Sequence, residues 1–219
     1  VLINLIAMFL AVLLNSRIAF KNGFRAIYFI PYTLAVLVIG YVFKYIFMVP
    51  LPALGQALHI DWLSTSMITS AQLAWIPIVF LTVWQSVAYN TLLYLAGLQT
   101  IDQEVYEAAE IDGANAWQRL RHIIIPMVMP AFTVSLFLTI TNSFKIFDVN
   151  FSLTGGGPSL LWHDKAIQST EFITMNIYNT ASGDNLMALG QARAVILFFI
   201  LVVISLIQTS ITKRKEIDL

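Results

Sequence analysis

Long apolar runs separated by short polar segments dominate this chain. They cover residues 27–49, 67–98, 123–147 and 191–211. Because a helix needs about 20 apolar residues to cross a bilayer, each of these runs is long enough to span a membrane. The composition agrees, since 58% of the residues are hydrophobic and only 11% are charged, which is far from the balance of soluble domains. We therefore expect an all-α, polytopic membrane protein.

The apolar run over residues 1–14 is too short for a complete crossing. It is interpreted as the second half of a spanning helix whose first half lies upstream. No charged leader precedes this run, as a signal peptide would require. The sequence thus predicts five spans here and six in the complete chain, in a single transmembrane domain over residues 1–219.

Composition and motifs also exclude several classes of function. The formal net charge is zero, so the broad basic surface of a nucleic-acid-binding protein is missing. The chain has no cysteine, which removes disulfides, thiolate metal sites and cysteine nucleophiles. HExxH and GxSxG motifs are absent, as are acid pairs within the apolar runs, so an intramembrane enzyme is disfavoured. We expect a non-catalytic subunit with no metal or cofactor of its own.

Basic residues predict the orientation of the chain in the membrane. They form clusters beside the run ends that would then lie on one side of the membrane: Arg17, Lys21, Arg25, Arg119, Arg121, Lys213, Arg214 and Lys215. Such clusters face the cytoplasm in membrane proteins. The C-terminus and the segment 102–125 are therefore expected inside, and the loop 148–189 outside. In the other outer segment, His59 and Asp61 are too few to form a metal site.

Prolines and glycines predict where helices begin, bend and turn. Pro31 should lie in the first turns of a helix over 27–49, with a turn at Pro50 and Pro52. Pro77 implies a tilted or bent helix over 67–98. Pro126 and Pro130 should bend the next span near its start. In the outer loop, residues 154–158 favour a defined turn, and a short surface helix is expected within 162–181.

The segment 102–125 is where the chain most clearly leaves the lipid. Five of the twelve acids in the chain, Asp102, Glu104, Glu107, Glu110 and Asp112, fall here within eleven residues. Asp102 is suited to cap the start of a helix, with Glu104 in its first turn. Gly113 should end this helix, and Asn115 with Gln118 has the form of a capping box that starts a second one. An ordinary solvated loop between spans is the alternative interpretation.

The same segment carries a family resemblance. The sequence from Tyr106 to Pro130, YEAAEIDGANAWQRLRHIIIPMVMP, resembles the EAA loop of the permease subunits of binding-protein-dependent ABC importers. The sequence LTGGGP at 153–158 is similar to the carbohydrate-uptake, maltose-type branch. The resemblance implies the type I importer permease fold. One departure is Leu120, where the family usually has an aromatic residue; the bulk lies at Trp117 instead, so the second helix should seat a little differently.

The resemblance implies roles for residues and for partners. The EAA loop is the coupling element that seats on a cytoplasmic ATPase subunit, and the residues carried over are Tyr106, Glu107, Ala108, Ala109, Asp112, Gly113, Ala114 and Pro126. The expected partners are a second permease subunit in a heterodimer, two ATPase subunits that bind ATP and Mg, and an external solute-binding protein. The implied location is a bacterial or archaeal cell membrane.

Two polar stripes lie within the predicted spans. Thr82, Gln85, Ser86 and Tyr89 share one helix face, as do Ser135, Thr139, Asn142 and Ser143 in the next span. Hydroxyl and amide groups in lipid need polar partners. One interpretation is a path for an uncharged solute such as a sugar, for which the resemblance supports Gln85, Tyr89, Asn142 and Ser143; the other is hydrogen bonding that holds helices together.

The sequence does not decide which solute is transported. An importer of the same fold could move amino acids, phosphate or another polar solute, but a charged solute would be expected to meet Arg or Lys in the stripes, and neither stripe holds one. A membrane scaffold without transport is the more remote alternative, since it would not need an acidic docking helix.

Overall fold

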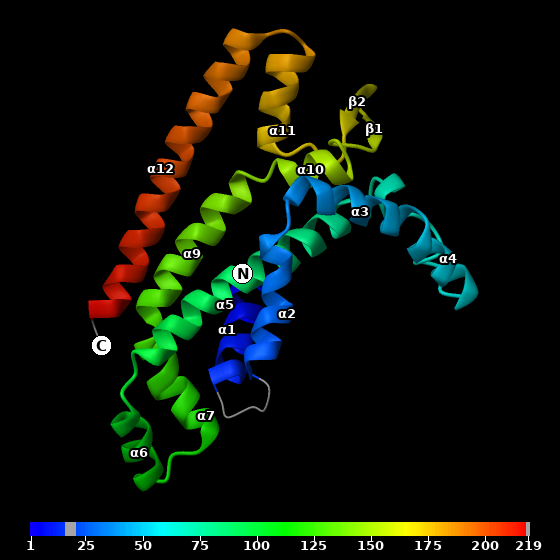
Figure 1. The fold of residues 1–219 in the computed structure, drawn as a ribbon. Helices are drawn as coiled ribbons and strands as arrows, with labels where there is room; N and C mark the ends of the chain where they lie inside the picture. Colours follow the sequence, from blue (N-terminus) through cyan, green and yellow to red (C-terminus); the bar gives the residue numbers. More distant parts are fainter. Residues whose placement is uncertain (16–20, 218–219) are drawn as a thin grey trace. The chain divides into compact units, whose positions relative to one another are not determined.

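The computed structural model describes residues 1–15 and 21–217 (Figure 1). Arg17 lies outside the described residues, as do the side chains of Lys21, Arg25, Arg214 and Lys215. The helical elements are α1 (Leu2–Asn15), α2 (Lys21–Thr33), α3 (Val36–Met48), α4 (Pro50–Ala57), η1 (Met67–Thr69), α5 (Trp75–Gln99), α6 (Gln103–Ile111), α7 (Ala116–Arg119), η2 (Leu120–Ile124), α8 (Ile125–Met127), α9 (Met129–Phe144), α10 (Asp148–Leu153), α11 (Ile173–Tyr178), η3 (Asn179–Gly183) and α12 (Met187–Ile217).

Within the described residues, three helical stretches are long and apolar enough to cross a membrane: Val36–Ala57, Trp75–Gln99 and Met187–Lys213. A fourth consists of Ala116–Met127 and Met129–Phe144, which meet at a bend of 68°. The shorter apolar helix α1 corresponds to the half span predicted over residues 1–14. The all-α prediction is confirmed, and every predicted apolar run contains helix.

The span predicted over 27–49 is wrong in its boundaries. It is divided between α2, which already begins at Lys21, and α3, with Ala35 extended at φ −62° and ψ 120°. Pro31 therefore lies near the end of α2 rather than in its first turns. Pro31 lies inside α2, where its missing N–H removes one bond of the helix and makes a break nearby less costly.

The turn predicted at Pro50 and Pro52 is also wrong. Helix α4 begins at Pro50, and the apolar helical stretch runs on to Ala57. A proline at the first position of a helix loses no hydrogen bond, because that N–H has no partner within the helix. Similarly, the helix predicted from Met67 begins only at Trp75, so that Pro77 lies in the first turn of α5, where a proline does not require a bend.

The segment 148–189 contains more structure than the sequence predicted. The turn expected at 154–158 is present, with Gly155 and Gly156 at φ 61° and 92°. The short helix expected within 162–181 is confirmed as α11. Between them lies a hairpin that was not predicted, in which β1 (Ser159–Trp162) pairs antiparallel with β2 (Lys165–Gln168). Helix α12 begins at Met187, four residues before the predicted start of the last span at Gln191.

The described chain forms two compact units. Unit 1 contains the described parts of Val1–Tyr32, Gln85–Thr141 and Leu201–Leu219, and unit 2 contains Thr33–Trp84 and Asn142–Ile200. The core of unit 1 includes Tyr94, Leu98 and Val128. The core of unit 2 joins residues of α3, α5 and α10, such as Ile39, Leu81 and Leu153. The acidic loop thus belongs entirely to unit 1.

Candidate functional site

The first helix of the acidic loop is α6. It begins after Asp102, whose backbone is extended at φ −61° and ψ 141° as in an N-cap, although its side chain makes no capping bond. Glu104 lies in the first turn, as predicted. The side chains of Glu107 and Ala108 are exposed, whereas Ala109 is buried. The accessible flank of α6 therefore contains the first alanine of the EAA sequence but not the second.

Gly113 ends α6 as the sequence predicted. Its φ is +74°, which costs little only for glycine. The Gly113 N–H donates to the carbonyl of Glu110 at 3.1 Å, and the Ala114 N–H donates to that of Ala109 at 2.9 Å. These two bonds form a Schellman motif, which satisfies carbonyls at the end of the helix. Asp112 precedes this turn with an exposed side chain.

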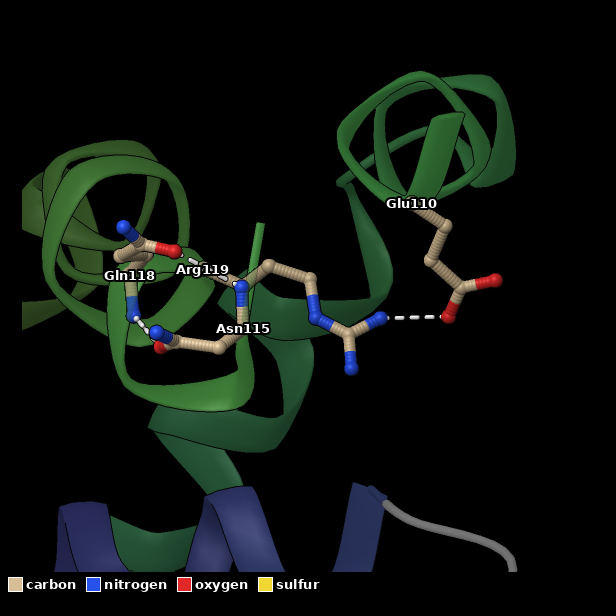
Figure 2. A network of polar contacts seen from close by, with 4 residues as sticks. All are labelled: Glu110, Asn115, Gln118 and Arg119. Atoms are coloured by element: carbon tan, nitrogen blue, oxygen red, sulfur yellow. Dashed lines mark hydrogen bonds and ion pairs between the residues drawn. The ribbon is translucent and has the colours of Figure 1, made fainter. Parts of the chain in front are cut away.

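The predicted capping box at the start of α7 is confirmed. The Gln118 N–H donates to Asn115 Oδ1 at 2.9 Å, and the Asn115 N–H donates to Gln118 Oε1 at 2.8 Å. Figure 2 shows this pair together with an ion pair between Arg119 of α7 and Glu110 of α6. Contacts of the side chains therefore connect the two short helices on either side of Gly113.

The second helix of the loop leads directly into a bent span. Helix α7 continues through the π-helical turn η2 into α8, and the chain bends by 68° before α9. Val128 lies at this bend, between Pro126 and Pro130. The predicted bend near these prolines is confirmed. A displacement of α7 would act on the start of this span, because no loop separates them.

The base of the acidic loop is anchored to the core of unit 1. Val105, Tyr106 and Ile124 pack against the cluster that contains Tyr94 and Leu98. Burial raises the pKa of the Tyr106 phenol, whose hydroxyl has no hydrogen-bond partner among the described residues. A cavity of about 950 Å³ lies beside Tyr106, and Leu120 and Trp117 also line it. Leu120 therefore faces space where the larger ring common in the family would fill more volume.

The four residues of the polar stripe on α5 differ in how far their side chains are buried. Gln85 is 8% exposed and its Nε2 donates to the carbonyl of Pro31 at 3.3 Å. Tyr89 is half-buried and stacks on Tyr32, with ring centroids 5.5 Å apart. Ser86 is half-buried, and its carbonyl accepts a bond from Asn90. In unit 2, the Thr82 hydroxyl is buried and has no partner among the described residues.

The stripe on α9 divides in the same way. Ser135 is fully buried, and its hydroxyl lies 2.6 Å from both Asn4 Oδ1 and Asn90 Oδ1. The Thr139 hydroxyl donates to Asn90 Oδ1 at 3.3 Å. Asn142 and Ser143 belong to unit 2 and are exposed. Hydrogen bonding within unit 1 thus accounts for Ser135 and Thr139, while the last two residues of the stripe are accessible.

Sequence analysis missed two residues at the centre of this polar network. Asn4 accepts from the Tyr94 hydroxyl at 2.7 Å and is 5% exposed, and Asn90 is 4% exposed. An amide in the middle of an apolar run is a signal that could have identified both, because such groups need internal partners in a membrane. The partners themselves, 90 and 131 residues from Asn4, could not be read from the sequence.

Comparison with known proteins places these features in a family. The model of the family described as "Binding-protein-dependent transport system inner membrane component" matches residues 3–217. The chain belongs to this family. The resemblance found in the EAA sequence is therefore confirmed, and the protein is a membrane component of a binding-protein-dependent transport system.

Individual relatives agree with that result. This chain is 39% identical over 219 residues to the "Probable starch degradation products transport system permease protein AmyD" of Thermoanaerobacterium thermosulfurigenes, and the match covers 100% of this chain and 72% of the relative. It is 37% identical over 204 residues to the "Multiple sugar-binding transport system permease protein MsmF" of Streptococcus mutans, covering 93% and 68%. A solved bacterial ABC transporter involved in alginate import has the same fold, with a TM-score of 0.82 at 18% identity over 95% of this chain and 72% of that one.

Proposed function

We propose that this permease is a non-catalytic subunit of an ATP-driven importer for an uncharged sugar or oligosaccharide. Two relatives that cover most of the chain are named for starch degradation products and for multiple sugars. The polar groups of Tyr89, Asn142 and Ser143 suit such a solute, since hydroxyl and amide groups bind sugars without a counter-ion. Transport follows alternating access, driven by closure of an ATPase dimer.

The observation that carries the coupling role is the geometry of the loop 102–125. Two short helices extend from the core of unit 1, and the second continues into a bent span. Such an element can transmit a displacement because hydrogen bonds order the turn between the two helices, at the end of α6 and at the start of α7. Tyr106, Glu107, Ala108, Asp112, Gly113 and Ala114 form or support the docking surface, with Ala109 as buried support and Pro126 at the bend.

The proposed assembly contains four further subunits. A second permease pairs with this one, and two cytoplasmic ATPase subunits bind ATP and Mg and contact the loop 102–125. An external solute-binding protein delivers the sugar to the side that carries the loop 148–189. The C-terminus lies in the cytoplasm of a bacterial or archaeal cell, in agreement with the basic residues at 213–215.

The sugar path is proposed to use the accessible members of the stripes. Tyr89, Asn142 and Ser143 offer an aromatic face, an amide and a hydroxyl, and none carries a formal charge. Gln85 and Thr139 instead hold helices of unit 1 together, because both are buried and hydrogen-bonded. Thr82 and Ser86 belong to the same stripe on α5 and are proposed as further members of the path. Neutral hydrogen bonds contribute about 0.5–1.5 kcal/mol each, which suits weak and easily released binding in transit.

The test of coupling is a charge reversal at Glu107 in the complete importer reconstituted in proteoliposomes. Glu107→Lys should abolish solute-stimulated ATP hydrolysis or assembly, because an exposed acid of a docking helix meets a basic partner residue. Asp61→Lys makes the same change of charge at an exposed residue of unit 2 and should leave activity intact. Normal uptake by Glu107→Lys would refute the coupling role.

The solute is tested by uptake of labelled maltooligosaccharides in the same vesicles. Uptake should require ATP and the solute-binding protein. Efficient transport of a charged solute, with no uptake of neutral sugars, would contradict the carbohydrate proposal and leave the family assignment intact.

A further inference from the structure

The two helices of the acidic loop share little apolar core. Ala109 is the one buried residue of α6, and the four residues of α7 include none. Beside them lies the cavity of about 950 Å³ that residues of α1, α5, α6, α7 and η2 line. Val105, Tyr106 and Ile124 hold the base of the loop on the core of unit 1, but little apolar packing joins α6 directly to α7, so polar contacts between the two helices can add to the restraint on their angle.

Polar contacts provide that restraint. The Schellman motif and the capping box order the two helix ends, but each is local to one end. The ion pair between Glu110 and Arg119 crosses the turn at Gly113 and joins one helix to the other (Figure 2). Both side chains also line the cavity. Among the hydrogen bonds and ion pairs of side chains in the described loop, this ion pair alone connects α6 with α7.

Each of the two helices joined by the ion pair also has one strongly exposed apolar side chain. Ile111 follows Glu110 and is 87% exposed, and Trp117 lies two residues before Arg119 and is 66% exposed. Scattered exposed apolar residues are normal on a protein surface. Here the two occur on short polar helices in an acidic loop, and tryptophan is the residue type most enriched where binding energy concentrates in protein interfaces.

We propose that Ile111 and Trp117 are two apolar anchors that dock on the ATPase subunit, and that the Glu110–Arg119 ion pair positions one anchor relative to the other. This inference rests on the proposed coupling function of the loop. The acids Asp102, Glu104, Glu107 and Asp112 surround the anchors in the sequence, so the surface fits apolar sockets with a basic rim. Such a rim supplies charge complementarity at the edge of the interface.

Arg119 and Glu110 act here as positioning residues. Exposed ion pairs contribute little to overall stability, and Glu110 is 66% exposed. Their loss should therefore leave expression and membrane insertion unchanged. The affected quantity is the number of solute molecules transported per ATP hydrolysed, because the anchors would no longer hold a fixed separation while the ATPase subunits close.

The anchors are tested by measuring how tightly the purified permease complex binds its ATPase subunit. Trp117→Ala should weaken binding by about tenfold or more, as expected for an interfacial tryptophan, and Ile111→Ala should weaken it less. Trp162→Ala is the matched control, since Trp162 is 62% exposed but lies in the hairpin. Unchanged binding of the ATPase subunit by both anchor variants would overturn the role of Ile111 and Trp117 as anchors. The same holds if the variants lower only binding to lipid vesicles, because the two side chains would then contact lipid instead.

The ion pair is tested by exchanging its charges. Glu110→Arg and Arg119→Glu should each lower transport per ATP, because two like charges then face each other across the turn. The double variant restores the attraction in the opposite sense and should recover most of the lost coupling. Loss in both single variants without recovery in the double variant would overturn the positioning role, as would full coupling in the single variants.

The outcome at Glu107 separates this inference from the proposed function. If Glu107→Lys abolishes ATPase stimulation while the anchor and ion-pair variants behave as wild type, the coupling loop stands and the present inference fails. If Glu107→Lys is also without effect, the proposed coupling function itself fails.

Discussion

Replacing Gly113 should damage coupling in proportion to the strain that a side chain creates at this position. Its φ is +74°, and a Cβ built on it would meet no atom within 4 Å. The cost of a substitution therefore comes from backbone conformation alone, with no contribution from steric contact. For an ordinary L-residue the left-handed conformation costs about 1–2 kcal/mol, so Gly113→Ala should lie in this range.

The side chain introduced sets the order of the effects. Asparagine tolerates the left-handed region, so Gly113→Asn should be the mildest variant. Valine is β-branched and is a genuine outlier at positive φ, so Gly113→Val should be the most severe. A chain that escapes the strain must give up the bonds from Gly113 and Ala114 to Glu110 and Ala109. Each hydrogen bond contributes about 0.5–1.5 kcal/mol.

The assay is solute-stimulated ATP hydrolysis by the complete importer. A loss of 1–2 kcal/mol in the docking-competent loop lowers the ratio of docking-competent to other loop conformations by a factor of about 5–30. Gly183→Ala is the matched control, because this glycine also has no atom within 4 Å of a built Cβ but does not adopt the left-handed conformation. Equal ATPase activity of Gly113→Val and Gly183→Ala would refute the reasoning. An equal loss of activity in Gly113→Asn and Gly113→Val would also refute it.

Three further predictions concern orientation, the sugar path and packing. A cysteine at Ala116 should react with an impermeant thiol reagent only in permeabilised cells, whereas one at Ser159 should react in intact cells; labelling of Ala116→Cys from outside would invert the orientation. Tyr89→Ala and Asn142→Ala should lower sugar uptake or change sugar preference with normal assembly; if they lower only thermal stability, these residues serve packing. Gly40→Ala places a Cβ 1.8 Å from Ser152 Oγ, so it should destabilise the protein by about 1–3 kcal/mol, measured as a lower thermal midpoint. Adding Ser152→Gly should recover much of that loss, and no recovery would place the cause elsewhere.

Local signals predicted the acidic loop well. A helix end at Gly113 and a capping box at Asn115 and Gln118 depend on residues at most a few positions apart, so the sequence contains all the necessary information. The same holds for the bend beside Pro126 and Pro130. The ion pair of Glu110 with Arg119 was not predicted, because it depends on how sharply the chain turns at Gly113.

The errors arise where one residue type suits two structures. A proline fits both a turn and the first position of a helix, and Pro50 adopts the second. The hairpin was missed because its strands have only four residues each, and its turn uses His163 and Asp164 at φ 48° and 59° instead of the asparagine and glycine that usually indicate such a turn. Apart from Leu160, the strand residues of the hairpin are exposed, so an alternation of buried and exposed residues did not indicate it either.

The polar stripes show why periodicity alone could not assign the sugar path. Every stripe residue satisfies the same three- and four-residue spacing, but burial separates residues that bond within unit 1 from those left accessible. Ser135 and Thr139 share the Asn90 oxygen, and the Ser135 hydroxyl can donate to only one of its two amide oxygens at a time. Bonds of this kind between helices in membranes contribute only about 0.6 kcal/mol each on average. Their arrangement therefore selects which helix faces meet, and we expect changes at Tyr89 and Asn142, which make none of these bonds, to act on transport without first disturbing that arrangement.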